Sequence, residues 1–119
     1  MTRTPAGERA RYADQLSERS RRRYDAAVPY SFEWDPKKAA SNLKDHGVSF
    51  DEATTVFGDI FAMNMPDPDH SEGEQRFLIL GMSEKSRLVV VSYAERLPRT
   101  RIISARPATS HERRKYEND

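Results

Sequence analysis

The sequence predicts a single small α+β domain in which two helices precede an antiparallel β-sheet and a third helix follows it. Apolar, β-branched runs at residues 76–82, 87–95 and 101–106 follow one another with only turn residues between them, which indicates an antiparallel meander. Ser49 and Thr109 are each followed three residues later by Glu, which is the signature of a helix start. Strands and helices in this order are typical of an α+β fold.

Residues 32–119 contain all of these elements, whereas residues 1–31 differ in composition. Seven arginines stand in residues 1–31 among small and polar residues, and large apolar residues are sparse. A segment of this kind cannot bury enough apolar surface to build a core. We therefore expect a basic, weakly packed N-terminal extension of residues 1–31 and a compact domain of residues 32–119.

The first helix of the compact domain has clear start and stop signals. After a short strand at residues 32–34, Asp35 has the position of an N-cap, and Pro36 follows where its missing N–H costs nothing. Gly47 is the expected left-handed C-cap. The helix is therefore predicted to run from Pro36 to about His46. Its buried stripe is expected to consist of Ala39, Ala40 and Leu43.

A second helix is predicted between Ser49 and Gly58, and it is expected to pack with the first as a pair. Its core-facing residues should be Ala53, Val56 and Phe57. Four strands are then expected, at residues 60–65, 76–82, 87–95 and 101–106, with the middle two forming a hairpin. The closing helix follows Thr109.

The last strand carries an arginine at each end and leads into the basic closing helix. Side chains alternate between the two faces of a strand, so Arg101 and Arg106 should point to opposite faces unless a bulge intervenes. The helix adds Arg113, Arg114 and Lys115. Basic side chains are thus expected on rigid elements.

Charge is segregated along the chain although the formal net charge is only +1. Residues 1–31 sum to +3, residues 32–75 to −7 and residues 76–119 to +5. A local basic surface of this kind fits a polyanion site, with phosphate the commonest target, although the arginines could equally pair with the acidic middle. The chain has no cysteine and no apolar run long enough to span a bilayer, so we expect a cytoplasmic protein without a thiolate metal site or a membrane partner.

Four segments of the chain, covering about residues 32–117, resemble the BrnT family of type II toxin–antitoxin ribonucleases. These segments are FEWDPKKAASNLKDHGVSFDEA, PDPDHSEGEQRFLILGMS, RLVVVSYAER and RIISARPATSHERRKYE. The resemblance implies a RelE-like fold and an endoribonuclease toxin that needs no cofactor and arrests growth by inhibiting translation. It also implies neutralisation by a BrnA-like ribbon-helix-helix antitoxin, through which alone the toxin would reach operator DNA. Because such an antitoxin is itself a dimer, we expect two toxins per antitoxin dimer.

RNA cleavage without a metal defines which residue types are needed. A base must take the 2′-hydroxyl proton, cations must stabilise the charged phosphorane, and an acid must protonate the leaving oxygen. Arginine serves only as the cation, because its pKa above about 12 rules out proton transfer. The base and acid are then to be found among His46, Glu95, Lys38 and Tyr116.

Two sets of candidate residues follow. The predicted catalytic residues are His46, Glu95, Arg76, Arg101 and Arg106. The predicted RNA-binding residues are Lys38, Arg113, Arg114 and Tyr116.

Several of these candidates have a structural alternative. His46 precedes a C-capping glycine and can simply complete the helix end, where the macrodipole favours its charged form. Glu95 can pair with a nearby arginine. A non-catalytic RNA- or protein-binding module that uses the same basic sheet is the alternative function.

An acidic loop precedes the hairpin and could in principle bind a divalent cation. It contains Asp67, Asp69, His70, Glu72 and Glu74. Their spacing matches no specific metal site, so a solvated loop is the preferred interpretation and no metal is expected. His111 is interpreted as a surface residue.

Overall fold

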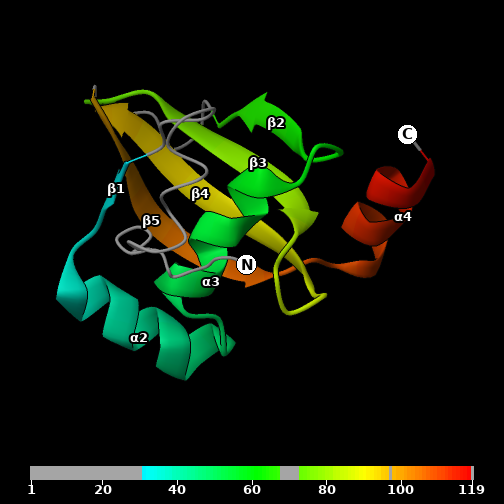
Figure 1. Ribbon diagram of the computed structural model, residues 1–119, viewed down its shortest axis with the longest axis horizontal. Coiled ribbons are helices and arrows are strands. Elements are labelled where there is room, and N and C mark those ends of the chain that lie inside the picture. The colour runs from blue at the N-terminus through cyan, green and yellow to red at the C-terminus, as the bar shows by residue number, and fades with distance from the viewer. Residues whose placement is uncertain (1–30, 68–72, 97, 119) are drawn as a thin grey trace.

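A computed structural model describes residues 31–67, 73–96 and 98–118 and contains a five-stranded sheet with the strand order β1-β5-β4-β3-β2 (Figure 1). The strands are β1 (Phe32–Glu33), β2 (Met63–Pro66), β3 (Arg76–Met82), β4 (Leu88–Arg96) and β5 (Arg99–Pro107). The helices are α2 (Pro36–His46), α3 (Phe50–Thr55), the short 3-10 helix η1 (Val56–Gly58) and α4 (Ser110–Asn118). The predicted extension of residues 1–31 lies, apart from Ser31, outside the described residues.

The sheet is mixed, whereas the sequence predicted a purely antiparallel one. Strands β2, β3, β4 and β5 pair antiparallel and include the expected hairpin. Strand β1, however, pairs parallel with β5 through Phe32 with Thr100 and Glu33 with Arg101. Partners this far apart in the chain leave no local signal, because the periodicity of a strand says nothing about its neighbour.

Strand β2 also begins later than expected. Ile60 and Phe61 belong to a turn in which the Asp59 carboxylate accepts the Phe61 N–H at 2.9 Å, so the strand starts at Met63. Both turn residues are exposed, Ile60 to 88% and Phe61 to 72%. The predicted strand at residues 60–65 is therefore wrong in its first half.

Helix α2 has the predicted ends but not the predicted buried stripe. The Asp35 carboxylate accepts the Lys37 N–H at 2.9 Å, and Gly47 closes the helix with φ 71°. Leu43, however, is 52% exposed and Ala40 is exposed, while Ala39 packs against the core. The buried residue of α2 is Asn42.

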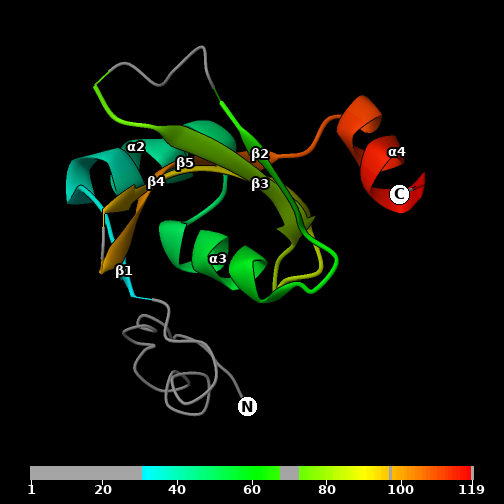
Figure 2. The ribbon, with the colours of Figure 1, turned by 90° about the horizontal axis from the view of Figure 1, so that it is seen from above.

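Asn42 explains this orientation, because it bonds to the outer edge of β5. Its side-chain amide donates to the Ala105 carbonyl at 2.8 Å and its side-chain oxygen accepts the Ala105 N–H at 3.1 Å. The same amide donates to the Val48 carbonyl. Asn42 thus supplies hydrogen-bond partners for the backbone of β5 beyond the point where β1 pairs with it. Helix α2 therefore lies along the β5 edge and α3 lies on a face of the sheet, and the two helices contact each other (Figures 1 and 2).

The main core lies between α3 and one face of the sheet. Figure 2 shows α3 on one side of the curved sheet. Ala53 and Val56 are buried and Phe57 packs against the same cluster, which confirms the predicted core-facing residues; Phe50, which was not predicted, is buried with them. The sheet contributes alternate residues of each strand, namely Ile79, Val89, Val91, Tyr93 and Ile102.

The opposite face has a smaller apolar cluster at one end, where α4 packs. Leu80, Leu88 and Val90 form it, with Tyr116 of α4 against them. The predicted capping box is confirmed: the Glu112 carboxylate accepts the Thr109 N–H, and the Thr109 hydroxyl accepts the Glu112 N–H. None of the helices in the described part of the chain is long and apolar enough to cross a membrane.

Candidate functional site

A β-bulge brings the two arginines of β5 to one face of the sheet. Ile102 pairs with Tyr93 and Ser104 pairs with Ser92, so Ile103 is left without a partner on β4. Arg101 is opposite Ala94 and Arg106 is opposite Val90. Since Ala94 and Val90 are four residues apart on β4, both arginines point to the same face. The bulge allowed for in the sequence prediction is therefore present.

Arg76 of β3 lies on this face as well. It is opposite Ala94 from the other side, so Arg76, Ala94 and Arg101 form one row across three strands. Neighbouring strands are about 4.8 Å apart, which places the two arginine backbones about 10 Å apart. Arg106 lies about 13 Å further along, at about 3.3 Å per residue. We call the surface formed by Arg76, Arg101 and Arg106 the arginine face.

Neither α3 nor α4 lies over the middle of the arginine face. Figure 2 shows α3 on the opposite side of the sheet and α4 displaced to one end. Between the two β5 arginines, Ser92 and Ser104 face each other and are half-buried. Ala94, which is 1% exposed, lies between Arg76 and Arg101. The surface between the arginines therefore consists of small residues, and at Ala94 neighbouring side chains cover it.

Each arginine of this face lies beside a carboxylate. Arg101 donates to Glu33 at 3.3 Å, and the Arg76 Nε lies 3.7 Å from a Glu74 oxygen. Glu74 also accepts two hydrogen bonds from Arg96. These side chains keep between about a quarter and a half of their surface exposed, which makes the pairs weak and available to competing anions.

Arg106 is held more tightly than Arg101. Its guanidinium donates to both oxygens of Glu112, at 2.8 and 2.9 Å. Because Glu112 also accepts the Thr109 N–H, its pKa is lowered to about 2, with the Arg106 hydrogen bonds as the main cause. The same bonds raise the pKa of Arg106. Glu112 therefore stays ionised at neutral pH and is a poor base.

Tyr116 is occupied by a bond to the turn before β2. Its hydroxyl donates to the Asp59 carboxylate at 2.5 Å, and this bond raises the pKa of Tyr116 to about 12. Burial raises the pKa of Asp59, but bonds from the Met82 N–H, from Tyr116 and from the Phe61 N–H outweigh it and leave the value below normal. A phenol held in this way anchors α4 and is a poor proton donor to RNA.

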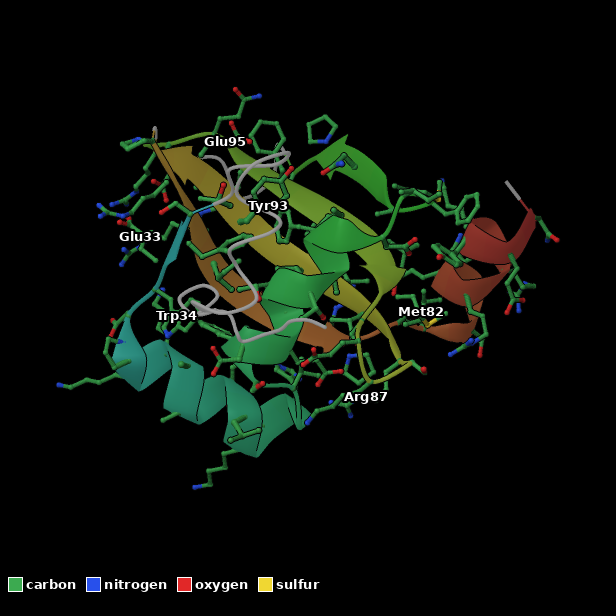
Figure 3. The ribbon with its side chains drawn as sticks, viewed as in Figure 1. Glu33, Trp34, Met82, Arg87, Tyr93 and Glu95 are labelled. Carbon is green, nitrogen blue, oxygen red and sulfur yellow. The ribbon has the colours of Figure 1, made fainter. Side chains whose placement is uncertain are left out.

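His46 and Glu95 do not lie in the row of Arg76, Ala94 and Arg101. Glu95 is opposite Thr100, one residue on from Ala94, so it points to the other face, and Figure 3 shows it at the end of β4, apart from Glu33. His46 adjoins Gly47, whose carbonyl accepts a bond from Arg87, the residue before β4. Arg87 is seven residues before Ala94, or about 23 Å at 3.3 Å per residue. The structure thus brings the predicted arginines together but neither predicted proton acceptor with Arg101.

The remaining predicted residues are at the periphery. Lys38 is exposed in the first turn of α2, and Arg113 and Arg114 are exposed on α4, where Arg113 pairs with Glu117 at 3.7 Å. His111 is exposed as expected. Of the acidic loop, Asp69, His70 and Glu72 lie outside the described residues, and the residues that are described contain no group of three potential metal ligands.

Comparison with known proteins assigns this arrangement to a family. Residues 34–112 match the family described as "Ribonuclease toxin, BrnT, of type II toxin-antitoxin system". The chain belongs to the BrnT family. The prediction of a ribonuclease toxin is thereby confirmed, and the family implies an RNA substrate and an antitoxin partner.

A solved structure has the same fold. The ribonuclease toxin BrnT of Brucella abortus, known at 1.1 Å resolution, superposes with a TM-score of 0.54 and 19% sequence identity. The match covers 68% of this chain and 99% of the other. No curated protein sequence matches the chain.

Sequence reasoning missed one residue of this BrnT chain's arginine face. Glu33 lies in the row of Arg76, Ala94 and Arg101, at the β1 edge (Figure 3). Sequence analysis identified it only as part of the short strand predicted at residues 32–34. Its neighbours depend on the parallel pairing with β5, so no local signal could have identified it.

Proposed function

We propose that the arginine face is where this BrnT toxin cleaves RNA, and that cleavage needs no metal ion. The observation that carries the proposal is that Arg76, Arg101 and Arg106 lie on one face of the sheet, Arg76 through the register of β3 with β4 and the two β5 arginines through the bulge. Planar guanidinium groups bind phosphate oxygens through two parallel bonds, and fixed cations stabilise the negative charge that develops on a phosphorane. Cations on strands are also held more rigidly than cations on loops.

The biological consequence would be growth arrest. We infer that the toxin cuts cellular RNA and thereby inhibits translation until a BrnA-like ribbon-helix-helix antitoxin covers it. Operator DNA would be contacted only by the antitoxin. Two toxins per antitoxin dimer is the assembly that two-fold symmetry favours. Mass measurement of the co-purified pair tests this, and one toxin per dimer would contradict it.

Loss of an arginine tests the site itself. We expect Arg101→Ala and Arg106→Ala each to lower single-turnover RNA cleavage by about 10²-fold in excess EDTA, as loss of one transition-state donor does in other enzymes. Arg101→Lys should recover only part of the rate, because an ammonium does not reproduce the two-pronged guanidinium.

Lys85 provides the matched control for these variants. It is exposed in the turn between β3 and β4, so Lys85→Ala removes one positive charge away from the arginine face. Its cleavage rate should equal that of the unmodified protein. Folded Arg101→Ala and Arg106→Ala proteins with full activity would place the reaction elsewhere, and cleavage only after addition of a divalent cation would contradict the metal-free mechanism.

A further inference from the structure

Glu33 is directed onto the arginine face by the residues on either side of it. Phe32 packs against Phe57 with ring centroids 5.1 Å apart, and Trp34 packs edge-on against Phe50 at 5.9 Å. Both aromatic rings belong to the core on the α3 side of the sheet. Because successive side chains of a strand point to opposite faces, Glu33 points away from that core and towards Arg101.

The backbone around Glu33 is fixed although β1 is short. Glu33 is opposite Arg101 in a parallel pair, and the Thr100 N–H donates to the Ser31 carbonyl at 2.8 Å. The Glu33 side chain is 31% exposed. A carboxylate placed in this way is both positioned and accessible to a ligand, as a group that exchanges a proton with a substrate must be.

Within the described residues, Glu33 has the fewest hydrogen bonds of the carboxylates beside these arginines. Glu112 has both oxygens bound by Arg106 and accepts a further bond from Thr109. Glu74 accepts two bonds from Arg96. Glu33 instead accepts one bond from the Arg101 Nη1, and that bond is 3.3 Å long. Its oxygens therefore keep the most capacity to accept a new proton.

We propose that Glu33 is the general base of this ribonuclease and takes the proton from the 2′-hydroxyl of the RNA. The inference depends on the proposed metal-free cleavage at the arginine face and assigns to it the proton acceptor that the arginines cannot supply. It differs from the sequence-based candidates His46 and Glu95, neither of which lies in the row of Arg76 and Arg101.

The arrangement gives a complete reaction. A phosphate of the RNA binds Arg101 and displaces the weak Arg101–Glu33 contact, which in an exposed pair is worth about 1 kcal/mol or less. The Glu33 carboxylate takes the 2′-hydroxyl proton while the 2′-oxygen forms a bond to the adjacent phosphorus. The bond from phosphorus to the 5′-oxygen then breaks, and the 5′-oxygen takes a proton from water. The products are a 2′,3′-cyclic phosphate and a free 5′-hydroxyl, and Glu33 returns its proton to the hydroxide left by that water.

Glu33→Gln is the variant that isolates this role. The amide keeps the size of the side chain and an oxygen that can accept from Arg101, but it cannot take up a proton at neutral pH. We expect single-turnover cleavage in excess EDTA to fall by about 10²- to 10⁴-fold, the usual contribution of a general base. Binding of an uncleavable 2′-O-methyl RNA should be unchanged or tighter, since a negative charge beside the phosphate is removed. Glu84→Gln, in the exposed turn between β3 and β4, is the matched control and should behave as the unmodified protein.

The pH profile separates a base from a merely structural residue. Cleavage by the unmodified protein should decline when the pH becomes low enough to protonate a carboxylate, and Glu33→Gln should lack this decline. Glu33→Asp should keep it at a lower rate, because the shorter side chain still accepts a proton. Should Glu33→Gln fail to fold by thermal melting, the presence or absence of this decline in Glu33→Asp decides the question.

The outcomes that overturn the proposal are distinct. One outcome is a folded Glu33→Gln protein that cleaves RNA at the unmodified rate and still loses activity at low pH, while Arg101→Ala is inactive. This result would exclude Glu33 as the base and would leave the proposal of RNA cleavage at the arginine face intact. An unmodified protein that does not cleave RNA in EDTA would overturn both proposals. A Glu95→Gln protein with the loss expected of Glu33→Gln would move the base to the other face of the sheet.

Discussion

Two arginine–glutamate clusters in this BrnT toxin differ in what surrounds the carboxylate. In the first cluster, next to the turn between β3 and β4, Arg87 donates to both oxygens of Glu52, and the Ser83 hydroxyl donates to the same carboxylate. Arg87 also donates to the Gly47 carbonyl. On the arginine face, Arg106 binds Glu112 and Arg101 binds Glu33. Both clusters consist of arginine–glutamate ion pairs, so residue type alone does not distinguish one cluster from the other.

The exposure of the arginines does not separate the clusters either. The Arg87 side chain is 41% exposed and that of Arg106 is 40% exposed. The glutamates differ, because Glu52 is 1% exposed, whereas Glu112 is 25% and Glu33 is 31% exposed. A buried carboxylate commits its arginine to the fold, whereas an accessible one leaves its arginine available to a competing phosphate. The comparison thus distinguishes a structural arginine from a functional one.

The largest effect should come from removing the partner of the buried carboxylate. We expect Arg87→Ala to lower the free energy of unfolding by about 3–5 kcal/mol, because it leaves the Glu52 charge buried and uncompensated. Urea denaturation measures this. The double variant Glu52→Leu with Arg87→Met should be more stable than Arg87→Ala alone, since no charge is left behind. If Arg87→Ala lowered the free energy of unfolding by less than Arg106→Ala does, the distinction between the two clusters would be wrong.

The next largest effect on stability should come from replacing the buried, uncharged side chain of Asn42. Asn42→Ala should lower the free energy of unfolding by about 2–3 kcal/mol, because it leaves the Ala105 N–H and carbonyl of the β5 edge without partners. The RNA cleavage rate per folded molecule should not change. Ser41→Ala, on the exposed side of α2, is the control and should be near neutral. A cleavage defect in folded Asn42→Ala would link the edge to the site.

The exposed pair should contribute less and should do so with a defined pH dependence. Hydrogen bonds from Arg106, and then from Thr109, lower the pKa of Glu112 from 4.5 to about 2, so these contacts stabilise the fold fully above pH 4.5 and lose this contribution as the pH falls towards 2. With partial solvent exposure the effect should be about 1 kcal/mol. Glu112→Gln should therefore flatten the decline of stability in this pH range. An equally steep decline in Glu112→Gln would assign it to other carboxylates.

The smallest effect is expected from the N-terminal extension. Deletion of residues 1–30 should leave the melting temperature and saturated single-turnover cleavage nearly unchanged, since the start signals of the domain at Phe32 to Pro36 need nothing upstream. If the arginines of the extension reach RNA, the salt dependence of binding should become flatter. Loss of cleavage in a truncated protein that still folds would make the extension part of the site.

Local signals in the sequence were sufficient for the ends of the elements. The N-cap at Asp35, the left-handed Gly47 and the capping box of Thr109 and Glu112 each depend on residues within one helical turn, and all were predicted correctly. The extents of β3 and the hairpin were predicted for the same reason, because turn residues and apolar runs are adjacent in the chain.

Long-range pairing explains what the sequence could not supply. Asn42 was not predicted to be buried, because its partner is the backbone of Ala105, 63 residues later. Glu33 was not recognised, because its position beside Arg101 depends on a parallel pair between residues 68 apart. The three arginines were identified by type, but their common face depends on the register of β4 with β3 and β5.

The bulge at Ile103 also makes the site tolerant of a change in strand length. Arg101 and Arg106 are an odd number of positions apart, and an odd separation in a regular strand puts two side chains on opposite faces. The unpaired Ile103 restores an even count against β4. A sequence that lost one residue here could lose the bulge and still keep both arginines on the same face. The two arginines would then be four positions apart in a regular strand, which matches the four positions between their partners on β4. Gain or loss of one residue at this point of β5 can therefore be compensated by gain or loss of the bulge. The number of residues between the two arginines is then a poor guide to whether two such sequences share the site.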